Sequence, residues 1–588
     1  MTVSPVISPV ARQAADWLKQ QLPVRARLSS DSRGIAAGDV FVAYPGETSD
    51  GRAHIARALD AGAVAIVLEQ AGAEAFDGVL RQAAVPSLRV EGLRRRAGEM
   101  AAAYLDEPSA RMTIVAVTGT NGKTSCTHWI AQGCNERVGP DNAGAPGAPG
   151  APGAPGARAA VIGTLGAGVP DEAGSRGSWA QAGHAALPRL TTPDAIGLQE
   201  QFETFAGQGI ELVALEASSI GLQQGRLNGT RIGVAVLTNL TRDHLDYHVT
   251  MQAYAAAKAK LFAWPTLEAM VVNLEDPASA EMLNAADPDL RRIGYLINDD
   301  PAGEAGRLVD AGERSASCSE LLTATPMDAH GRFVLSHFRA GDRSAGLATD
   351  EDDVAASAGS VDLQLSLIGR FNLSNALAVA GVWTALGWSL AEVSAQLERL
   401  RPVPGRLQVV GDAADPHLPL AVVDYAHTPD AIANALLALR PLAERRGGRL
   451  WCVFGAGGNR DTGKRPPMAA AAERHADKVV LTSDNPRNEA PEAILAQLSG
   501  GLARAPYLVQ ADRALAIGAA LQAADAADVV LIAGKGHEAY QEVGNRRLAF
   551  SDVDQARLAL QERAARDRQA AGNANADDGA NGSGGDDV

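Results

Sequence analysis

Short apolar runs rich in β-branched residues recur along the chain and alternate with stretches whose apolar positions follow a helical period. Runs of this kind are typical of strands buried on both faces of a parallel sheet. The alternation therefore predicts α/β domains with helices on both faces of doubly wound sheets. The clearest predicted strands are residues 63–68, 112–117, 211–215, 232–237, 421–424, 450–454, 478–481 and 528–532.

Three segments interrupt this pattern and have the composition of loops or tails. Residues 144–157 repeat Gly-Ala-Pro, a run far too short for a collagen helix, and we expect a flexible surface loop. Residues 339–359 are rich in Gly, Ser, Ala and Asp, which predicts a solvated acidic loop. The tail, residues 566–588, ends in a stretch rich in Asn, Gly and Asp that is expected to be disordered.

Composition and charge restrict the class of protein. The chain has 588 residues, of which 46% are hydrophobic and 21% charged, so we expect a globular protein of several domains. A net charge of −16 disfavours nonspecific binding to nucleic acid or to an anionic membrane. The four scattered cysteines indicate reduced thiols in a cytosolic protein. We expect neither a signal peptide nor a membrane span, because no apolar run reaches the ~18 residues that a span needs.

One motif points directly to a nucleotide. The predicted strand 112–117 is followed by Thr118-Gly119-Thr120-Asn121-Gly122-Lys123-Thr124 and then by a helical pattern. In such a turn, backbone N–H groups face the phosphates of ATP, the lysine neutralises them, and the threonine hydroxyl can bind Mg²⁺. Val117 stands where the common form of this loop has a glycine. The alternative is an ordinary turn between a strand and a helix.

Carboxylates and imidazoles follow the next predicted strands. The strand 211–215 ends at Glu216, and the one after it leads into Asp243-His244-Leu-Asp246-Tyr-His248. Ligands bind at this edge of open α/β sheets, and Mg²⁺ takes carboxylate oxygens together with substrate phosphates. The cluster therefore predicts a metal site or, alternatively, a set of side chains that cap the strand ends. Lys258 lies on a predicted helix, where a lysine is normally a solvated surface charge.

Polar segments also recur in the C-terminal third of the chain. Three of them directly follow predicted strands, at the expected carboxyl edge of a doubly wound sheet, where ligands bind. Gly455-x-Gly457-Gly458 has no third glycine at the spacing of a dinucleotide fingerprint, so we interpret it as a ligand loop rather than an NAD site. The loops are residues 403–406, 424–430, 455–461, 483–487 and 534–538.

Taken together, these motifs resemble the Mur ligase family, in the family's order and over residues 28–555. The resemblance implies cytosolic, monomeric enzymes that use ATP and Mg²⁺ to add one amino acid to a UDP-linked peptide in peptidoglycan synthesis, releasing ADP and phosphate. It implies an N-terminal UDP-binding domain, a central P-loop ATPase-type doubly wound domain and a C-terminal Rossmann-like domain that binds the amino acid. Their expected bounds are 1–108, 109–402 with inserts near 141–157 and 339–359, and 403–565, before a disordered tail at 566–588.

The resemblance assigns roles to individual residues around ATP. Lys123 would contact the transferred phosphate, Thr124 would bind Mg²⁺, and Glu216 and His244 would complete the metal sites. Lys258 matches a lysine that the family carbamylates, which turns an ammonium into an anionic oxygen ligand suited to Mg²⁺. The implied ATP-binding residues are Gly119, Thr120, Asn121, Gly122, Lys123, Thr124, Ser125, Asn372, Asn375, Arg406, Asp424 and His427.

The resemblance also implies the two other substrates, UDP-N-acetylmuramoyl-L-Ala-D-Glu and meso-diaminopimelate. Arg487 offers a two-pronged donor for the far carboxylate of diaminopimelate, while Asp484 or Glu538 can hold its far ammonium. The implied contacts to the UDP-linked peptide are Ser30, Ser32, Glu47, Thr48, Ser49, Thr191, Thr192, Ser218, Gln224 and Arg226. Those to diaminopimelate are Arg460, Asp484, Asn485, Pro486, Arg487, Gly534 and Glu538.

Alternatives stay open at this point. Leu190, Ile220 and Asn459 differ from the residues that the family commonly has at those positions. A ligase that adds lysine would share the scaffold but would not need Arg487. A folylpolyglutamate synthase-like ligase would lack the N-terminal domain and the Asp-Asn-Pro-Arg sequence. A nucleotide-dependent scaffold protein would not need Lys123, Glu216, His244 and Lys258 together.

Overall fold

The computed structural model describes residues 6–47, 49–137, 158–170, 190–298, 314–327, 331–339, 359–412 and 415–581. The predicted Gly-Ala-Pro loop and the core of the predicted acidic loop lie outside these ranges. The chain divides into two compact units. The first comprises Met1–Leu240, Tyr247–Ser366 and Leu373–Leu400, and the second comprises Thr241–Asp246, Leu367–Asn372 and Arg401–Val588.

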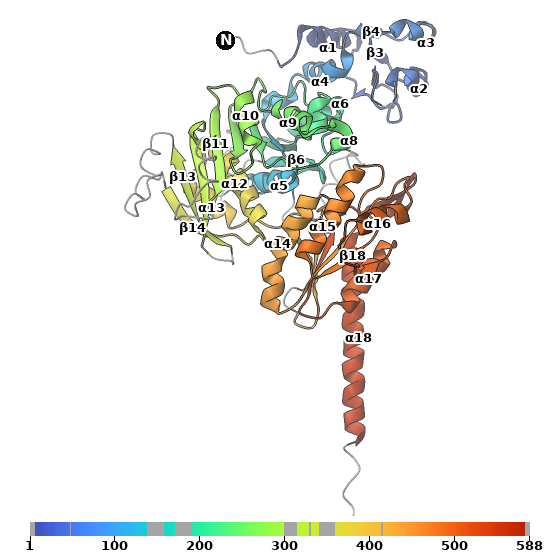
Figure 1. Cartoon of the computed structure of the whole chain (residues 1–588). Coiled ribbons are helices and arrows are strands. Elements are labelled where there is room, and N and C mark those ends of the chain that lie inside the picture. The colour runs from blue at the N-terminus through green and yellow to red at the C-terminus, as the bar shows by residue number, and fades with distance from the viewer. Residues whose placement is uncertain are drawn as a thin grey trace, which may run out of the picture. The chain divides into compact units, whose positions relative to one another are not determined.

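The N-terminal part of the first unit is a small parallel sheet with helices on both faces (Figure 1). Alternate residues of one strand enter two different cores: Val40 and Val42 pack on one face, and Phe41 and Ala43 on the other. The strands, in sheet order, are β1 (Leu28–Ser29), β2 (Val40–Ala43), β3 (Ala65–Glu69) and β4 (Ser87–Val90). The helices are α1 (Pro9–Gln21), α2 (Ile55–Asp60), α3 (Asp77–Ala83) and α4 (Leu93–Tyr104).

The larger sheet of the first unit has the order β14-β13-β12-β11-β10-β9-β5-β8-β6-β7. Its middle is parallel and fully buried, as the apolar runs predict. Its strands are β5 (Thr113–Thr118), β6 (Ala159–Gly163), β7 (Gly166–Gly168), β8 (Leu212–Glu216), β9 (Val234–Leu237), β10 (Ala269–Asn273), β11 (Arg291–Ile297), β12 (Glu320–Pro326), β13 (Arg332–Arg339) and β14 (Gly359–Gln364). Its helices include α5 (Lys123–Glu136), α6 (Ala195–Gly207), α7 (Ser219–Gln223), α8 (Leu245–His248), α9 (Met251–Ala259), α10 (Ser279–Ala285), α12 (Arg370–Ala385) and α13 (Leu390–Leu397).

The antiparallel strands at both edges of this sheet were not predicted. β13 pairs antiparallel with β12 and β14, and β7 pairs antiparallel with β6. β13 alternates buried and exposed residues, because one of its faces is less covered than the middle of the sheet. A strand of this kind lacks the continuous apolar run that identified the parallel strands.

The second unit contains a sheet of order β15-β16-β20-β17-β18-β19, parallel except for β15, with a core on each face. Its strands are β15 (Gln408–Val410), β16 (Leu420–Asp424), β17 (Leu450–Phe454), β18 (Lys478–Leu481), β19 (Leu508–Val509) and β20 (Val529–Ala533), and a hairpin of β21 (Tyr540–Val543) and β22 (Arg546–Ala549) follows. Its helices are α14 (Pro429–Arg446), α15 (Arg465–His475), α16 (Pro491–Ser499), α17 (Arg513–Ala523) and α18 (Asp552–Asn581).

The end of the chain differs from the sequence expectation. α18 continues to Asn581, through most of the segment for which disorder is expected (Figure 1). Alanines and arginines, which have high helix propensity, are frequent around residues 563–571 and favour the first part of the extension. Among the residues that the structure describes, no helix is both long and apolar enough to cross a bilayer.

A buried carboxylate joins the outer strands of the larger sheet. Glu320 accepts hydrogen bonds from Arg291 at 2.7 Å, and its other oxygen lies 2.8 Å from Nε2 of His337. Burial alone would raise the pKa of Glu320, but these two partners outweigh it and lower the pKa from 4.5 to about 2. The ionised carboxylate therefore stabilises the fold fully above about pH 4.5, and this contribution disappears as the pH falls towards 2.

Glu320→Gln should reduce the dependence of the free energy of unfolding on pH. Between pH 7 and pH 3 we expect the free energy of unfolding of the wild type to fall by about 2 kcal/mol more than that of the variant. Urea titrations at the two pH values measure the difference. Glu91→Gln, at an exposed carboxylate, is the control and should behave as the wild type does. Equal losses in wild type and Glu320→Gln would contradict the prediction.

Candidate functional site

The predicted phosphate loop has the strand–turn–helix geometry that the motif requires. β5 ends at Thr118, and α5 begins at Lys123 with Gly122 before it in the left-handed region at a φ of 84°. Asn239, after β9, fixes the loop, because its carbonyl accepts from the Thr120 N–H at 2.9 Å and its side chain from the Asn121 N–H at 2.9 Å. The loop is therefore held by a neighbouring strand of its own sheet.

The two glycines of the loop are required by close approach as well as by backbone angle. A Cβ on Gly119 would come within 1.8 Å of the Thr238 hydroxyl, and one on Gly122 within 2.3 Å of the Asn375 side-chain oxygen. Gly122→Ala should therefore cost stability, by about 1–3 kcal/mol, and weaken nucleotide binding.

Thermal unfolding and ATP titration of the variant test this expectation. Gly518→Ala is the matched control, because Gly518 lies inside α17 and a Cβ there would meet nothing within 4 Å. This control should be neutral or slightly stabilising. A Gly122→Ala protein with unchanged melting temperature and ATP affinity would show that the loop tolerates the side chain.

Two lysine ammonium groups converge on the loop. Lys123 donates to the carbonyls of Gly119 at 2.9 Å and Thr120 at 2.8 Å. Lys258, from α9, donates to the same Gly119 carbonyl at 2.8 Å and lies over the ring of Tyr254. Lys258 is only 1% exposed, so it is not the solvated surface charge that a helical lysine normally is. Both positive charges would attract an anion bound at this loop.

Glu216 lies beside Thr124, as the sequence predicts. The buried carboxylate, at the end of β8, accepts from the Thr124 hydroxyl at 3.0 Å and from the backbone N–H and hydroxyl of Thr164 at 2.8 and 3.0 Å. A hydroxyl and a carboxylate at this distance are hard oxygen ligands that fit a Mg²⁺ ion bound together with phosphate oxygens. Thr164 was not predicted, because nothing in its local sequence marks it.

His244 lies in the second unit, whereas Thr124, Glu216 and Lys258 lie in the first. It has a φ of 54°, and its Nε2 is 3.6 Å from the buried carboxylate of Asp243. Burial would raise the pKa of Asp243, but His244, Lys464 and His427 hold it well below its usual range. Within the described part of the chain, no three His, Cys, Asp or Glu side chains gather as a metal site. The metal role of His244 stays a prediction.

Five of the ten residues predicted for the UDP-linked peptide form one network in the first unit. The Thr192 hydroxyl lies 2.9 Å from that of Ser218, and Arg226 donates to the Thr192 carbonyl at 2.9 Å and to the Gln224 side chain at 2.8 Å. Thr191 lies 3.3 Å from Thr164 and so joins this network to Glu216. Burial lowers the pKa of Arg226, although nearby acidic groups oppose the shift.

Two of the residues predicted for the UDP-linked peptide in the N-terminal part form hydrogen bonds with side chains that were not predicted. Ser30 donates to Asp194, the N-cap of α6, at 3.4 Å, and Glu47 accepts from Tyr247 at 2.7 Å and from Arg94 at 3.0 Å. Thr48 lies outside the described residues. Ser32 is buried, and the carbonyl of Ser49 accepts from the Gly46 N–H at 2.8 Å.

The nucleotide residues predicted in the C-terminal half are distributed over both units. In the second unit, Asp424 ends β16 and accepts from the N–H groups of Leu407 and Ala426, both at 2.8 Å, while burial raises its pKa. Arg406 lies 4.4 Å from the ring of Tyr425, whose carbonyl is 2.8 Å from Nδ1 of His427. The remaining two are buried: Asn372, in the second unit, donates to the Ile368 carbonyl at 2.8 Å, and Asn375, in the first, lies against Gly122.

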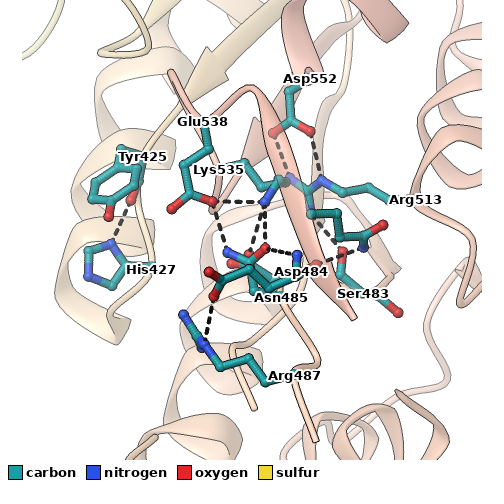
Figure 2. Close-up of polar contacts among 12 residues, drawn as sticks. Tyr425, His427, Ser483, Asp484, Asn485, Arg487, Arg513, Lys535, Glu538 and Asp552 are labelled. Carbon is teal, nitrogen blue, oxygen red and sulfur yellow. Dashed lines mark hydrogen bonds and ion pairs between the residues drawn. The ribbon is translucent and has the colours of Figure 1, made fainter. Parts of the chain in front are cut away.

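Three of the residues predicted for diaminopimelate, Asp484, Asn485 and Glu538, lie around a lysine that was not predicted (Figure 2). The buried ammonium of Lys535 donates to Asn485 at 2.9 Å and to Glu538 at 2.8 Å, and it lies 3.7 Å from Asp484. Burial would raise the pKa of Asp484, but Lys535 and Arg513 lower it, whereas burial raises that of Glu538. The sequence signal for Lys535 is its place inside the loop 534–538, directly after β20.

Arg487 lies in the loop after β18, and two of its guanidinium nitrogens have partners in the protein. Its Nε donates to Glu542 at 3.0 Å and its Nη1 to the Gly458 carbonyl at 2.9 Å. Its φ is 52°, so its backbone is in the left-handed region that a residue with a Cβ rarely adopts. Gly534 lies against the Asp484 carboxylate, and Arg460 is exposed beside Gly457. The predicted residues thus lie in the loops after β17, β18 and β20. Pro486 is part of the loop after β18.

Comparison with known proteins covers almost the whole chain. Three family profiles match in succession: "Mur ligase family, catalytic domain" at residues 26–105, "Mur ligase middle domain" at 117–383 and "Mur ligase, glutamate ligase domain" at 405–536. These segments coincide with the three sheets, and the predicted three-domain α/β fold is confirmed.

Similar proteins were found among curated sequences and solved structures. A UDP-N-acetylmuramoyl-L-alanyl-D-glutamate--2,6-diaminopimelate ligase of Acidovorax sp. (strain JS42) is 43% identical, covering 94% of this chain and 97% of the relative. Its namesake from Pseudomonas aeruginosa is 41% identical over 91% of this chain and 94% of the relative. A solved structure with the same name is 32% identical, with a TM-score of 0.54, covering 91% of this chain and 94% of the other.

Proposed function

This chain belongs to the Mur ligase family, and we propose that it is the ATP-dependent ligase that adds meso-2,6-diaminopimelate to UDP-N-acetylmuramoyl-L-Ala-D-Glu. The observation that carries the proposal is similarity along nearly the full length to ligases named for this reaction, at 43% identity for the Acidovorax relative. The product is the UDP-linked tripeptide of peptidoglycan synthesis. We further propose that the protein acts in the cytoplasm as a monomer.

The phosphate loop and its surroundings would hold ATP with Mg²⁺. Lys123, with its ammonium already at the loop, would neutralise the transferred phosphate, and Thr124 and Glu216 would supply oxygen ligands to the ion. Carbamylation of Lys258 would replace its ammonium by an anionic oxygen ligand. His244 is proposed to complete the metal site. Asn372, Asn375, Arg406, Asp424 and His427 are proposed to contact the nucleotide.

The proposed reaction proceeds through an acyl phosphate. A γ-carboxylate oxygen of D-Glu attacks the γ-phosphorus of ATP, and ADP leaves. The amine of diaminopimelate then attacks the acyl carbon, the amide forms as phosphate leaves, and the amine loses a proton. Because a carboxylate attacks a phosphate, two anions must approach each other. Lys123 would offset this repulsion in the transition state, and Mg²⁺ would supply further positive charge.

The acceptor site has the charges that diaminopimelate requires. Its far end carries one carboxylate and one ammonium. Arg487, held at its Nε edge by Glu542, would bind the carboxylate. Asp484 and Glu538 surround the one ammonium of Lys535, so with both ionised they retain one negative charge for the ammonium of the substrate. L-Lysine has no far carboxylate to offer Arg487, which disfavours the lysine-adding alternative.

Phosphate release tests the proposal. The purified protein is given ATP, Mg²⁺ and UDP-N-acetylmuramoyl-L-Ala-D-Glu, with meso-diaminopimelate or L-lysine in parallel. We expect release with diaminopimelate and little with lysine. Release with lysine would keep the ligase but overturn the assignment of the acceptor, and release with neither would favour the scaffold alternative.

A further inference from the structure

A buried ion pair that has no role in the reaction described above lies next to the acceptor loops (Figure 2). Arg513 is the first residue of α17 and Asp552 the first of α18, and both side chains are fully buried. The guanidinium binds both carboxylate oxygens, through Nε and through Nη2, at 2.7 Å each. Such a two-pronged contact fixes the orientation of the arginine.

The same guanidinium also holds the backbone of two acceptor loops. Its Nη1 donates to the Ser483 carbonyl at 3.1 Å and its Nη2 to the Ala533 carbonyl at 2.9 Å. These carbonyls directly precede Asp484 and Gly534, two residues proposed to contact diaminopimelate. In the sheet, β17 lies between β18 and β20, so this contact joins loops from strands that are not paired with each other.

β17, the strand between β18 and β20, ends close to the loop that follows β18. A Cβ on Gly455, directly after β17, would lie 2.3 Å from the Thr482 carbonyl and 2.8 Å from the Asp484 N–H. Three strand ends are thus within contact distance of Asp484, and Arg513 fixes the outer two. A shift of the Ser483 or Ala533 carbonyl would move the Asp484 side chain or Gly534, on which an added Cβ would lie 3.0 Å from that carboxylate.

A general contribution to the stability of the fold explains the Arg513–Asp552 ion pair less well than a positioning role does. Burying two charges costs desolvation energy that their attraction often only offsets, so a buried ion pair is weak evidence for added stability. Here the pair instead orients donors towards two carbonyls at a ligand edge of the sheet. Asp552 also balances the charge of Arg513, which is therefore available to orient the loops without adding net charge beside Asp484.

We propose that Arg513, oriented by Asp552, is a positioning residue for the acceptor amino acid. It holds the loops that present Asp484 and Gly534 at the separation that the far end of the acceptor requires. The inference rests on the proposed function, because it takes these loops as the acceptor site. It predicts a selective effect on the acceptor, since the hydrogen bonds of Arg513 go to Asp552 and to the backbone of the two loops proposed for the acceptor.

Arg513→Lys tests this role. Lysine keeps a charge for Asp552 but cannot reach both carbonyls and both carboxylate oxygens at once. We expect the KM for meso-diaminopimelate to rise roughly tenfold or more, with the KM values for ATP and the UDP-linked peptide changed less than about twofold. The double variant Arg513→Met with Asp552→Leu removes the pair without leaving an isolated buried charge, and should give the same selective effect if the lysine variant fails to fold.

Arg563→Lys is the matched control. Arg563 is also buried and also donates to two carbonyls of the second unit, those of Leu521 and Ala524, at the other end of α17. A structural role alone predicts the same kinetic change in both variants, or equal changes in all three KM values, and either result would overturn the proposal. Wild-type phosphate release with diaminopimelate, measured in the same experiment, separates failure of this inference from failure of the proposed function.

Discussion

Lys123→Ala should abolish phosphate release, reducing kcat by roughly 10³-fold or more while the protein stays folded. The ammonium of Lys123 is half-buried and donates to two uncharged loop carbonyls, those of Gly119 and Thr120, so we expect the fold to tolerate its loss. In the proposed reaction, by contrast, the substitution removes a positive charge from the transferred phosphate. Steady-state phosphate release at saturating ATP measures the effect, and thermal unfolding shows whether the fold is kept.

Lys260→Ala is the control for this substitution. Lys260 follows α9, is exposed, and donates to the side chain of Gln223 rather than to the phosphate loop. Its removal should leave kcat within about twofold of the wild type, as for most surface substitutions. If Lys123→Ala turned over at a near-normal rate, the assignment of residues 118–124 as the phosphate loop would be wrong.

Arg487→Ala should have the second largest effect, and it should be confined to the acceptor. Losing the partner of a substrate carboxylate costs about 3 kcal/mol, so kcat/KM for meso-diaminopimelate should fall about 100-fold. The KM for ATP should not change. Alanine is as unfavourable as arginine at a φ of 52°, so the substitution does not change the backbone strain. The loss of kcat/KM therefore measures the contribution of the Arg487 side chain.

Arg547→Ala provides the comparison for Arg487→Ala. Arg547 also pairs with Glu542, at 3.0 Å, but its side chain is about half exposed. Surface ion pairs contribute little, so this variant should keep nearly normal kinetics. If both variants lost the same activity, the hairpin around Glu542 would be the important element, and Arg487 would not be the carboxylate ligand.

The sequence was sufficient to predict the parallel strands, because strands buried on both faces carry continuous apolar runs that polar residues rarely interrupt. Every predicted strand is present, and the phosphate loop lies between β5 and α5 as expected. The Thr124–Glu216 contact was also predictable. Both residues follow neighbouring parallel strands, β5 and β8, whose carboxyl ends meet at one edge.

Side-chain partners far apart in the sequence were beyond prediction. Lys535 lies in a predicted ligand loop but was assigned no role, yet it is the centre of the cluster proposed for the acceptor, where it donates to Asn485, 50 residues away in the sequence. Lys258 shows the same limit: the local sequence predicts an exposed helical lysine, whereas tertiary packing buries it beside the Gly119 carbonyl. The pattern identifies which loops meet, but which charges pair within them depends on side-chain packing.

The composition of the second unit has a practical consequence for dividing this protein into fragments. A piece that began at Arg401 would lack Ile368 and Phe371, which pack on the core of that unit. It would also lack Asp243, so the buried ammonium of Lys464 would lose the carboxylate 3.5 Å from it. The C-terminal part is therefore discontinuous in the chain. A fragment that begins at Leu367 restores the apolar contacts, and the missing carboxylate must be supplied by the rest of the protein.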